Sequence, residues 1–154
     1  MKITDYLTEK LIAVNLSAPG KEEAIAALVD HIVAQGGVDS GRRDALIEKL
    51  TERESLGSTG VGGGVAIPHA SGENMEKMMV AIGKFPKGVD YSAIDSKPVN
   101  LVFMIIGPTR QPRAHLQLLA AIVRTLRNKP LLASILESTD PAHIYKSLKE
   151  AEGN

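Results

Sequence analysis

A glycine-rich stretch that ends in a proline and a histidine constrains the fold of this chain more than any other feature. Residues 56–70 read LGSTGVGGGVAIPHA, with five glycines within eight positions. Glycine loses much backbone entropy on folding, which is tolerable where the chain turns tightly or another molecule approaches the backbone. Proline fixes φ and has no N–H to donate to a sheet. We therefore expect a short strand over residues 65–67 that ends at Pro68 and leaves His69 pointing out of the sheet.

The length and charge of the chain restrict its class. A chain of 154 residues is long enough to bury roughly two thirds of the surface that its unfolded form exposes, so we expect residues 1–154 to form a single domain. Eighteen basic and eighteen acidic residues cancel. No overall field therefore attracts nucleic acid or an anionic membrane, and we expect no nucleic-acid partner.

Two absences in the sequence bear on its location. The chain contains no cysteine, which excludes disulfides and thiolate metal sites. No apolar run approaches the roughly twenty residues of a membrane span, and the N-terminal residues lack the apolar core of a signal peptide. We expect a cytoplasmic protein that does not insert into a membrane.

Apolar periodicity and turn residues indicate a chain that alternates strands and helices. Apolar runs rich in β-forming residues predict buried strands over residues 11–16, 78–85 and 99–106. Helical spacing of apolar residues predicts helices over residues 22–35, 40–54, 113–127 and 129–137, and a last helix that opens at Asp140 and Pro141. Residues 71–74 read as a polar turn, and the segments between the later strands read as turns and not as a linker.

The helix predicted over residues 113–127 carries a histidine near its start. His115, Leu119, Ile122 and Leu126 share one helix face, so we expect His115 to head a buried apolar stripe. Free backbone N–H groups and the positive end of the helix dipole favour an anion nearby and disfavour an imidazolium. A histidine that only caps the end of a core helix fits the pattern equally well.

The second predicted helix ends in a cation. Arg53 stands close to the start of the glycine-rich loop. It is either an ordinary last-turn cation favoured by the helix dipole, or a guanidinium placed near His69 that can hold two phosphate oxygens at a time. We interpret the remaining histidines, His31 and His143, as helix side chains that face solvent.

Several common site motifs are missing. The glycines lack the Lys-Ser/Thr pair of a nucleotide-binding P-loop, and a strand follows them where a dinucleotide site requires a helix. His69 has only Glu73 at nearby ligand spacing, so we expect no metal site. No Gly-x-Ser-x-Gly motif marks a hydrolase nucleophile.

Together, these residues resemble a known family. Residues 53–69, 99–103 and 114–119 are similar to the IIA component of the bacterial phosphoenolpyruvate-dependent phosphotransferase system, in the fructose/mannitol class that includes the nitrogen-regulatory IIA proteins. The similarity extends over residues 7–148, although this chain has Gly63 where many members have Asn or His. The resemblance implies an α/β fold, a three-layer α/β/α sandwich around a mixed β-sheet, with the site at one edge of the sheet.

The resemblance also implies the site residues. The phosphorylated histidine of the family matches His69, its active-site arginine matches Arg53, and its second histidine matches His115. Ser58 and Thr59 are further candidates for holding phosphoryl oxygens as charge moves during transfer. His115 would hydrogen-bond the phosphoryl group or fix the ring of His69. A neutral imidazole is nucleophilic without a separate base, so His69 is expected to attack a donor phosphohistidine in line.

The implied function is that of a phosphohistidine carrier that takes its phosphoryl group from a histidine phosphocarrier protein, with no cofactor. Two downstream roles stay open. One is a signalling module of the nitrogen-regulatory type, whose phosphorylation state controls binding to target proteins; the other is a sugar-specific component that passes the phosphate to a IIB domain. A free-standing chain that ends at Asn154 favours the nitrogen-regulatory type. A relative that has lost phosphorylation is disfavoured, because His69, Arg53 and His115 are all present.

Overall fold

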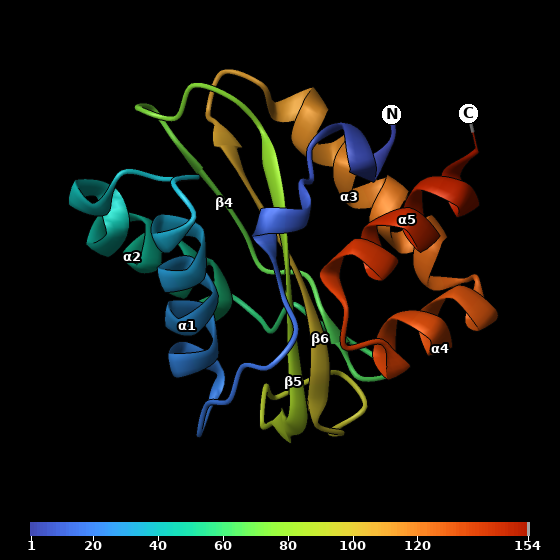
Figure 1. Ribbon diagram of the computed structural model, residues 1–154. Coiled ribbons are helices and arrows are strands. Elements are labelled where there is room, and N and C mark those ends of the chain that lie inside the picture. The colour runs from blue at the N-terminus through green and yellow to red at the C-terminus, as the bar shows by residue number, and fades with distance from the viewer. Residues whose placement is uncertain (154) are drawn as a thin grey trace.

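A mixed β-sheet lies between two layers of helices (Figure 1) in the computed structural model, which describes residues 1–153. One face is covered by α1 (Lys21–Ala34) and α2 (Arg43–Ser55). The other face is covered by α3 (Pro112–Leu126), α4 (Lys129–Glu137) and α5 (Pro141–Glu152). Short 3-10 helices are η1 (Ile3–Asp5), η2 (Glu9–Leu11) and η3 (Ser40–Arg42). The expected three-layer α/β/α arrangement is confirmed.

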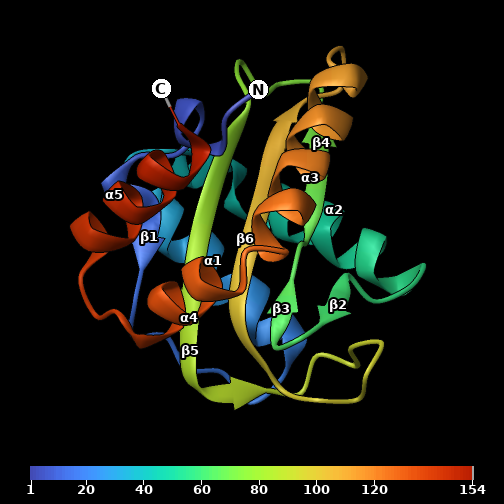
Figure 2. The ribbon, with the colours of Figure 1, turned by 90° about the vertical axis from the view of Figure 1, so that its right-hand side faces the viewer.

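Two long antiparallel strands, β5 (Met79–Val89) and β6 (Val99–Pro108), form the centre of the sheet. The short strands are β1 (Ile12–Ala13), β2 (Gly60–Gly62), β3 (Val65–Ala66) and β4 (His69–Gly72). The order is β1-β5-β6-β3-β2, and β4 also pairs with β6, beyond the end of β3 (Figure 2). β1 runs parallel to β5, β3 and β4 run parallel to β6, and β2 runs antiparallel to β3.

The central strands are apolar because helices cover both faces of the sheet. Every residue of β6 is buried except Asn100, as expected of a strand packed on both sides. Strand β5 carries one buried cation, Lys84, whose ammonium group donates to the carbonyl of Ser138 just after α4. Burial lowers the pKa of Lys84. A hydrogen bond therefore accompanies the one polar side chain buried in this strand.

The helices follow the sequence patterns closely. Helix α4 has the predicted bounds, and the carboxylate of Asp140 accepts the N–H of Ala142 at 3.0 Å, which confirms the start of α5. The second helix differs at its start, because Ser40 begins a 3-10 turn and α-helical geometry begins only at Arg43. None of the helices in residues 1–153 is both long enough and apolar enough to span a membrane.

The buried stripe of α3 is turned relative to the prediction. Its fully buried residues are Leu118, Ala121 and Ile122. Leu119 and His115 are only partly buried. The stripe predicted from helical spacing is therefore displaced around the helix axis, and His115 lies at its border, next to solvent.

The structure corrects the expected path of the chain at Pro68. Strand β3 stops at Ala66, but pairing with β6 resumes at His69 in the same register. Pro68 cannot donate a hydrogen bond, yet its carbonyl accepts the N–H of Ile105 at 3.0 Å. The sheet is thus interrupted at Pro68 and does not end there. The polar turn expected over residues 71–74 was wrong in its first half, which belongs to β4.

The glycine-rich loop needs glycine for two different reasons. Gly62, Gly63 and Gly64 have φ angles of 93°, 66° and 81°, in the left-handed region that favours glycine. Gly60 is required by packing, since a Cβ there would lie 2.7 Å from the Cβ of Ala93. The loop can therefore turn sharply and pack closely against the segment that joins β5 to β6.

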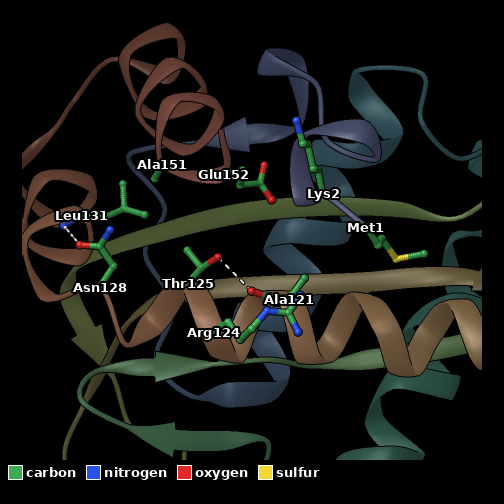
Figure 3. Close-up of a pocket in the computed structure, with 9 residues that line it drawn as sticks. All are labelled: Met1, Lys2, Ala121, Arg124, Thr125, Asn128, Leu131, Ala151 and Glu152. Carbon is green, nitrogen blue, oxygen red and sulfur yellow. Dashed lines mark hydrogen bonds between the residues drawn. The ribbon is translucent and has the colours of Figure 1, made fainter. Parts of the chain in front are cut away.

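The two ends of the described chain meet beside α3 (Figure 3). The carboxylate of Glu152 accepts hydrogen bonds from the backbone N–H groups of Ile3 and Thr4, and Lys2 donates to the carbonyl of Gly153 at 2.7 Å. A carboxylate at the start of η1 satisfies N–H groups that a helix leaves free. The neighbouring hollow of about 280 Å³, whose lining Figure 3 draws, contains none of the residues that the sequence singled out.

We expect Gly60→Ala to lower the free energy of unfolding by about 1–3 kcal/mol, because the added Cβ overlaps Ala93. Urea unfolding followed by circular dichroism measures this change. Gly41→Ala is the control, since the nearest atom to a Cβ at Gly41 is a carboxylate oxygen of Asp39 at 3.7 Å, and its effect should stay within about 0.5 kcal/mol. A Gly60→Ala protein as stable as the wild type would contradict this packing argument.

Candidate functional site

A hollow beside β4 brings together three residues that the sequence singled out. His69, Arg53 and His115 all line it, although they come from β4, the last turn of α2 and the first turn of α3. The hollow has a volume of about 680 Å³. β4 pairs on one side only, and α2 and α3, which cover opposite faces of the sheet (Figures 1 and 2), both contribute residues to the hollow. Among residues 1–153, no three His, Asp or Glu side chains cluster closely enough to hold a metal ion.

The ring of His69 is held in one orientation. Its Nδ1 atom lies 3.0 Å from the carbonyl oxygen of Ile67. A carbonyl oxygen only accepts hydrogen bonds, so Nδ1 is the nitrogen that carries the proton. In the neutral ring, Nε2 then holds the lone pair. Of the two ring nitrogens, Nε2 is therefore the one that can act as a nucleophile in the neutral ring.

The side chain of Arg53 fits both interpretations left open by the sequence. Its Nη1 donates to the carbonyl of Gly57 at 2.8 Å, so it stabilises the end of α2 as a last-turn cation. It also lines the hollow with His69. Arg53 takes part in none of the ion pairs of residues 1–153. The other N–H groups of the guanidinium can thus bind an anion in the hollow.

His115 has a buried nitrogen without a partner. Its Nε2 atom makes no hydrogen bond within the described residues. Burial lowers the pKa of His115, and nearby His69 lowers it further, whereas the carbonyls of Pro108 and Gly107 oppose this shift. The ring is therefore neutral over more of the pH range than an ordinary histidine. Buried polar atoms without partners are rare, and this nitrogen can form a hydrogen bond with a group from outside the described residues.

The structure does not bring Ser58 and Thr59 into the hollow. The hydroxyl of Ser58 donates to the carbonyl of Tyr91 at 2.9 Å and accepts the N–H of Gly60 at 3.0 Å. Thr59 is buried, and its hydroxyl donates to Glu54. Both hydroxyl groups are engaged within the fold. We therefore remove both residues from the set that could contact a ligand of His69.

Three other hydroxyl residues, Ser55, Ser71 and Thr109, line the hollow and were missed in the sequence. The hydroxyl of Ser55 donates to the carbonyl of Glu52 within α2. Ser71 follows His69 by two positions on β4, and side chains two apart share one face of a strand. That period would have pointed to Ser71 if the strand had been recognised. Thr109 follows the end of β6. It comes close to His69 through the pairing of β4 with β6, which no local pattern displays.

Known proteins are similar to this chain over nearly its whole length. Residues 5–151 match the family described as "Phosphoenolpyruvate-dependent sugar phosphotransferase system, EIIA 2". The chain belongs to this family. The EIIA protein is 37% identical over 153 residues to the fructose-specific EIIA component of Haloferax volcanii, with 97% of this chain and 98% of the relative covered. It is 34% identical over 149 residues to the nitrogen regulatory protein of Bradyrhizobium diazoefficiens, with 96% and 95% covered.

Solved structures share the fold of this EIIA protein. The nitrogen regulatory protein IIA-Ntr of Neisseria meningitidis superimposes with a TM-score of 0.86 at 24% identity, covering 96% of this chain and 99% of that one. A chain from the complex of enzyme IIA mannitol with phosphorylated enzyme IIB mannitol of Escherichia coli gives a TM-score of 0.73 at 22% identity, covering 92% and 97%. At these identities the likeness concerns the fold, and it supports the α/β sandwich.

We expect the free energy of unfolding to fall as the pH is lowered through about 6.5, the ordinary pKa of histidine. Because the folded state lowers the pKa of His115, the unfolded state binds more protons between the lowered value and 6.5, and stability rises with pH across that window. Urea unfolding between about pH 5 and pH 8 measures the slope. His115→Gln should flatten it, whereas His143→Gln, at an exposed position, should not. Equal slopes for wild type and His115→Gln would count against a buried neutral ring.

Proposed function

We propose that His69 accepts a phosphoryl group on Nε2 from the phosphohistidine of a histidine phosphocarrier protein, so that this EIIA protein acts as a phosphohistidine carrier. One observation carries the proposal. The 3.0 Å contact of Nδ1 with the carbonyl of Ile67 leaves the lone pair of the neutral ring on Nε2, and His69 lines a hollow that Arg53 and His115 also line. A neutral imidazole can attack phosphorus without a separate base.

The transfer balances without a nucleotide or a metal ion. As the Nε2 lone pair attacks in line, a P–N bond to His69 forms and the P–N bond of the donor breaks, so the donor nitrogen leaves with its electron pair. One P–N bond replaces another, which keeps the step close to thermoneutral and reversible. Nδ1 keeps its proton, and the Ile67 carbonyl continues to accept the hydrogen bond from Nδ1–H while the ring gains positive character.

Arg53 and His115 supply the groups for the phosphoryl oxygens. The guanidinium binds oxygens through charge-assisted hydrogen bonds as charge moves. A phosphoryl dianion beside His115 favours the protonated ring, which opposes the effect of burial on its pKa. The unpartnered Nε2 of His115 then becomes a donor. Ser71 and Thr109 add two hydroxyl groups to the same hollow.

The surroundings of the hollow favour a protein as donor and acceptor. Leu56, which lines the hollow, is 84% exposed, and Leu116, which follows His115, is 68% exposed. Exposed apolar side chains beside a polar site are typical of protein contact surfaces. The mannitol IIA protein of the same fold was solved in complex with phosphorylated IIB. This precedent supports docking of a phosphocarrier protein, or of a IIB domain, over His69.

Two downstream roles each have a relative in their favour. The nitrogen regulatory relative supports a signalling role, and the fructose-specific relative supports onward transfer to a IIB domain. Chain length does not separate them, because the chain spans 95% of the first and 98% of the second. Phosphorylated protein mixed with a fructose-type IIB domain decides between them. Movement of the label to IIB indicates the sugar-specific role, and its retention indicates the regulatory one.

We predict that His69 is the only phosphorylated residue. Incubation with phosphoenolpyruvate, enzyme I and a histidine phosphocarrier protein should add one acid-labile phosphate to the wild type and none to His69→Ala. The control His143→Ala, at an exposed position that does not line the hollow, should label like the wild type. Label on His69→Ala would refute the assignment.

We predict that His115→Ala still accepts phosphate on His69 but holds or transfers it less well. Loss of a hydrogen bond to a charged group is worth about 1.5–3 kcal/mol, or roughly 10- to 150-fold in the lifetime of phosphorylated His69 or in the rate of onward transfer. A chase experiment compares both quantities with the wild type. Identical values in both assays would show that His115 is only a core histidine.

A further inference from the structure

The last turn of α2 contains two consecutive charged residues, one that lines the hollow and one that is buried in the fold. Arg53 lines the hollow, whereas Glu54 is only 4% exposed. Burying a carboxylate is costly unless it is well paired. The position near the end of a helix adds to this cost, because the dipole disfavours negative charge there. A group held at such a cost must have strong compensating contacts.

The contacts of Glu54 are all donors or cations. Both carboxylate oxygens lie 3.2 Å from the backbone N of Thr59, whose hydroxyl also donates to Oε1. The hydroxyl of Tyr91 donates to Oε1 at 3.2 Å, and the Lys21 ammonium lies 3.8 Å from Oε2. Burial raises the pKa of Tyr91, and the charge of Glu54 adds to this effect. This environment fits an ionised carboxylate that holds Thr59 in place.

A chain of hydrogen bonds leads from this carboxylate to His69. The carbonyl of Thr59 accepts the N–H of Ile67 at 2.9 Å, and the carbonyl of Ile67 accepts Nδ1–H of His69 at 3.0 Å. These contacts stand where the pairing of β3 and β4 with β6 is interrupted, at Ile67 and Pro68. The backbone N–H of Ile67 is therefore bound by Thr59 and not by β6, and the carbonyl of Ile67 orients the His69 ring.

We propose that Glu54 is a positioning residue for the phosphotransfer proposed above, on which this inference rests. By holding Thr59, it keeps the Ile67 carbonyl in place and thereby fixes the Nδ1–H form of His69. Glu54 also connects the end of α2 to the glycine-rich loop on the core side, through Thr59. Arg53 makes a second connection on the side of the hollow, through the carbonyl of Gly57. The positions of His69 and of Arg53 thus both depend on one buried carboxylate, that of Glu54.

Glu54→Gln tests this inference, because it keeps the shape of the side chain but removes its charge and turns one acceptor into a donor facing Thr59 and Tyr91. Saturated with phosphorylated phosphocarrier protein, the variant should transfer phosphate about 10- to 100-fold more slowly, with KM unchanged within about twofold. In ¹⁵N NMR spectra, the share of the Nδ1–H form of His69 should fall. Glu48→Gln, at an exposed position on the same helix, should match the wild type in all three measurements.

Substitutions at Thr59 provide a second test that does not depend on the folding of Glu54→Gln. Thr59→Val removes the hydroxyl donor and should slow transfer and shift the His69 tautomer, whereas Thr59→Ser keeps the donor and should restore both. A wild-type tautomer together with a wild-type rate in Glu54→Gln or in Thr59→Val would overturn the inference. The tautomer measurement needs no phosphotransfer. A wild-type protein that takes no phosphate would therefore refute the proposed function alone.

Discussion

The pairing of β6 along both of its edges is the constraint on which the site depends. β6 joins β5 on one side and both β3 and β4 on the other. Since β3 and β4 keep one register on β6 across Pro68, this strand decides where His69 stands. The chain then passes from β6 through Thr109 to α3, which carries His115. One buried strand therefore places both histidines of the hollow.

The hollow combines a rigid backing with polar groups that can still form hydrogen bonds. The backing is the cluster of Glu54, Thr59 and Tyr91 inside the fold, whose side-chain oxygens are hydrogen-bonded to one another. On the side of the hollow, the guanidinium of Arg53 keeps N–H groups beyond the one that donates to Gly57, and the Nε2 atom of His115 has no partner within the described residues. Groups that are held in place before a ligand arrives need little reorganisation as charge moves, which is how a preorganised site stabilises a transferring phosphoryl group.

Relatives with different names share the fold and extend over nearly the whole chain. A fold supports several functions because function depends on the site and on the surfaces around it. The chemistry proposed for His69 requires only the hollow itself. In the proposed function, a partner protein docks on exposed side chains such as Leu56 and Leu116, and these can change without altering the residues proposed to hold the phosphoryl group.

The sequence by itself determined the helices, and its resemblance to a family singled out His69, Arg53 and His115 as candidate site residues, because periodicity, helix caps and a motif are carried by neighbouring residues. Only the tertiary structure decided that the chain after Pro68 is a strand, since its hydrogen bonds come from β6, far away in the sequence. It also decided that the hydroxyl of Thr59 donates to the buried carboxylate of Glu54, and that Ser71 lines the hollow. The type of a residue limits which contacts it can make, but long-range pairing selects which of them it does make.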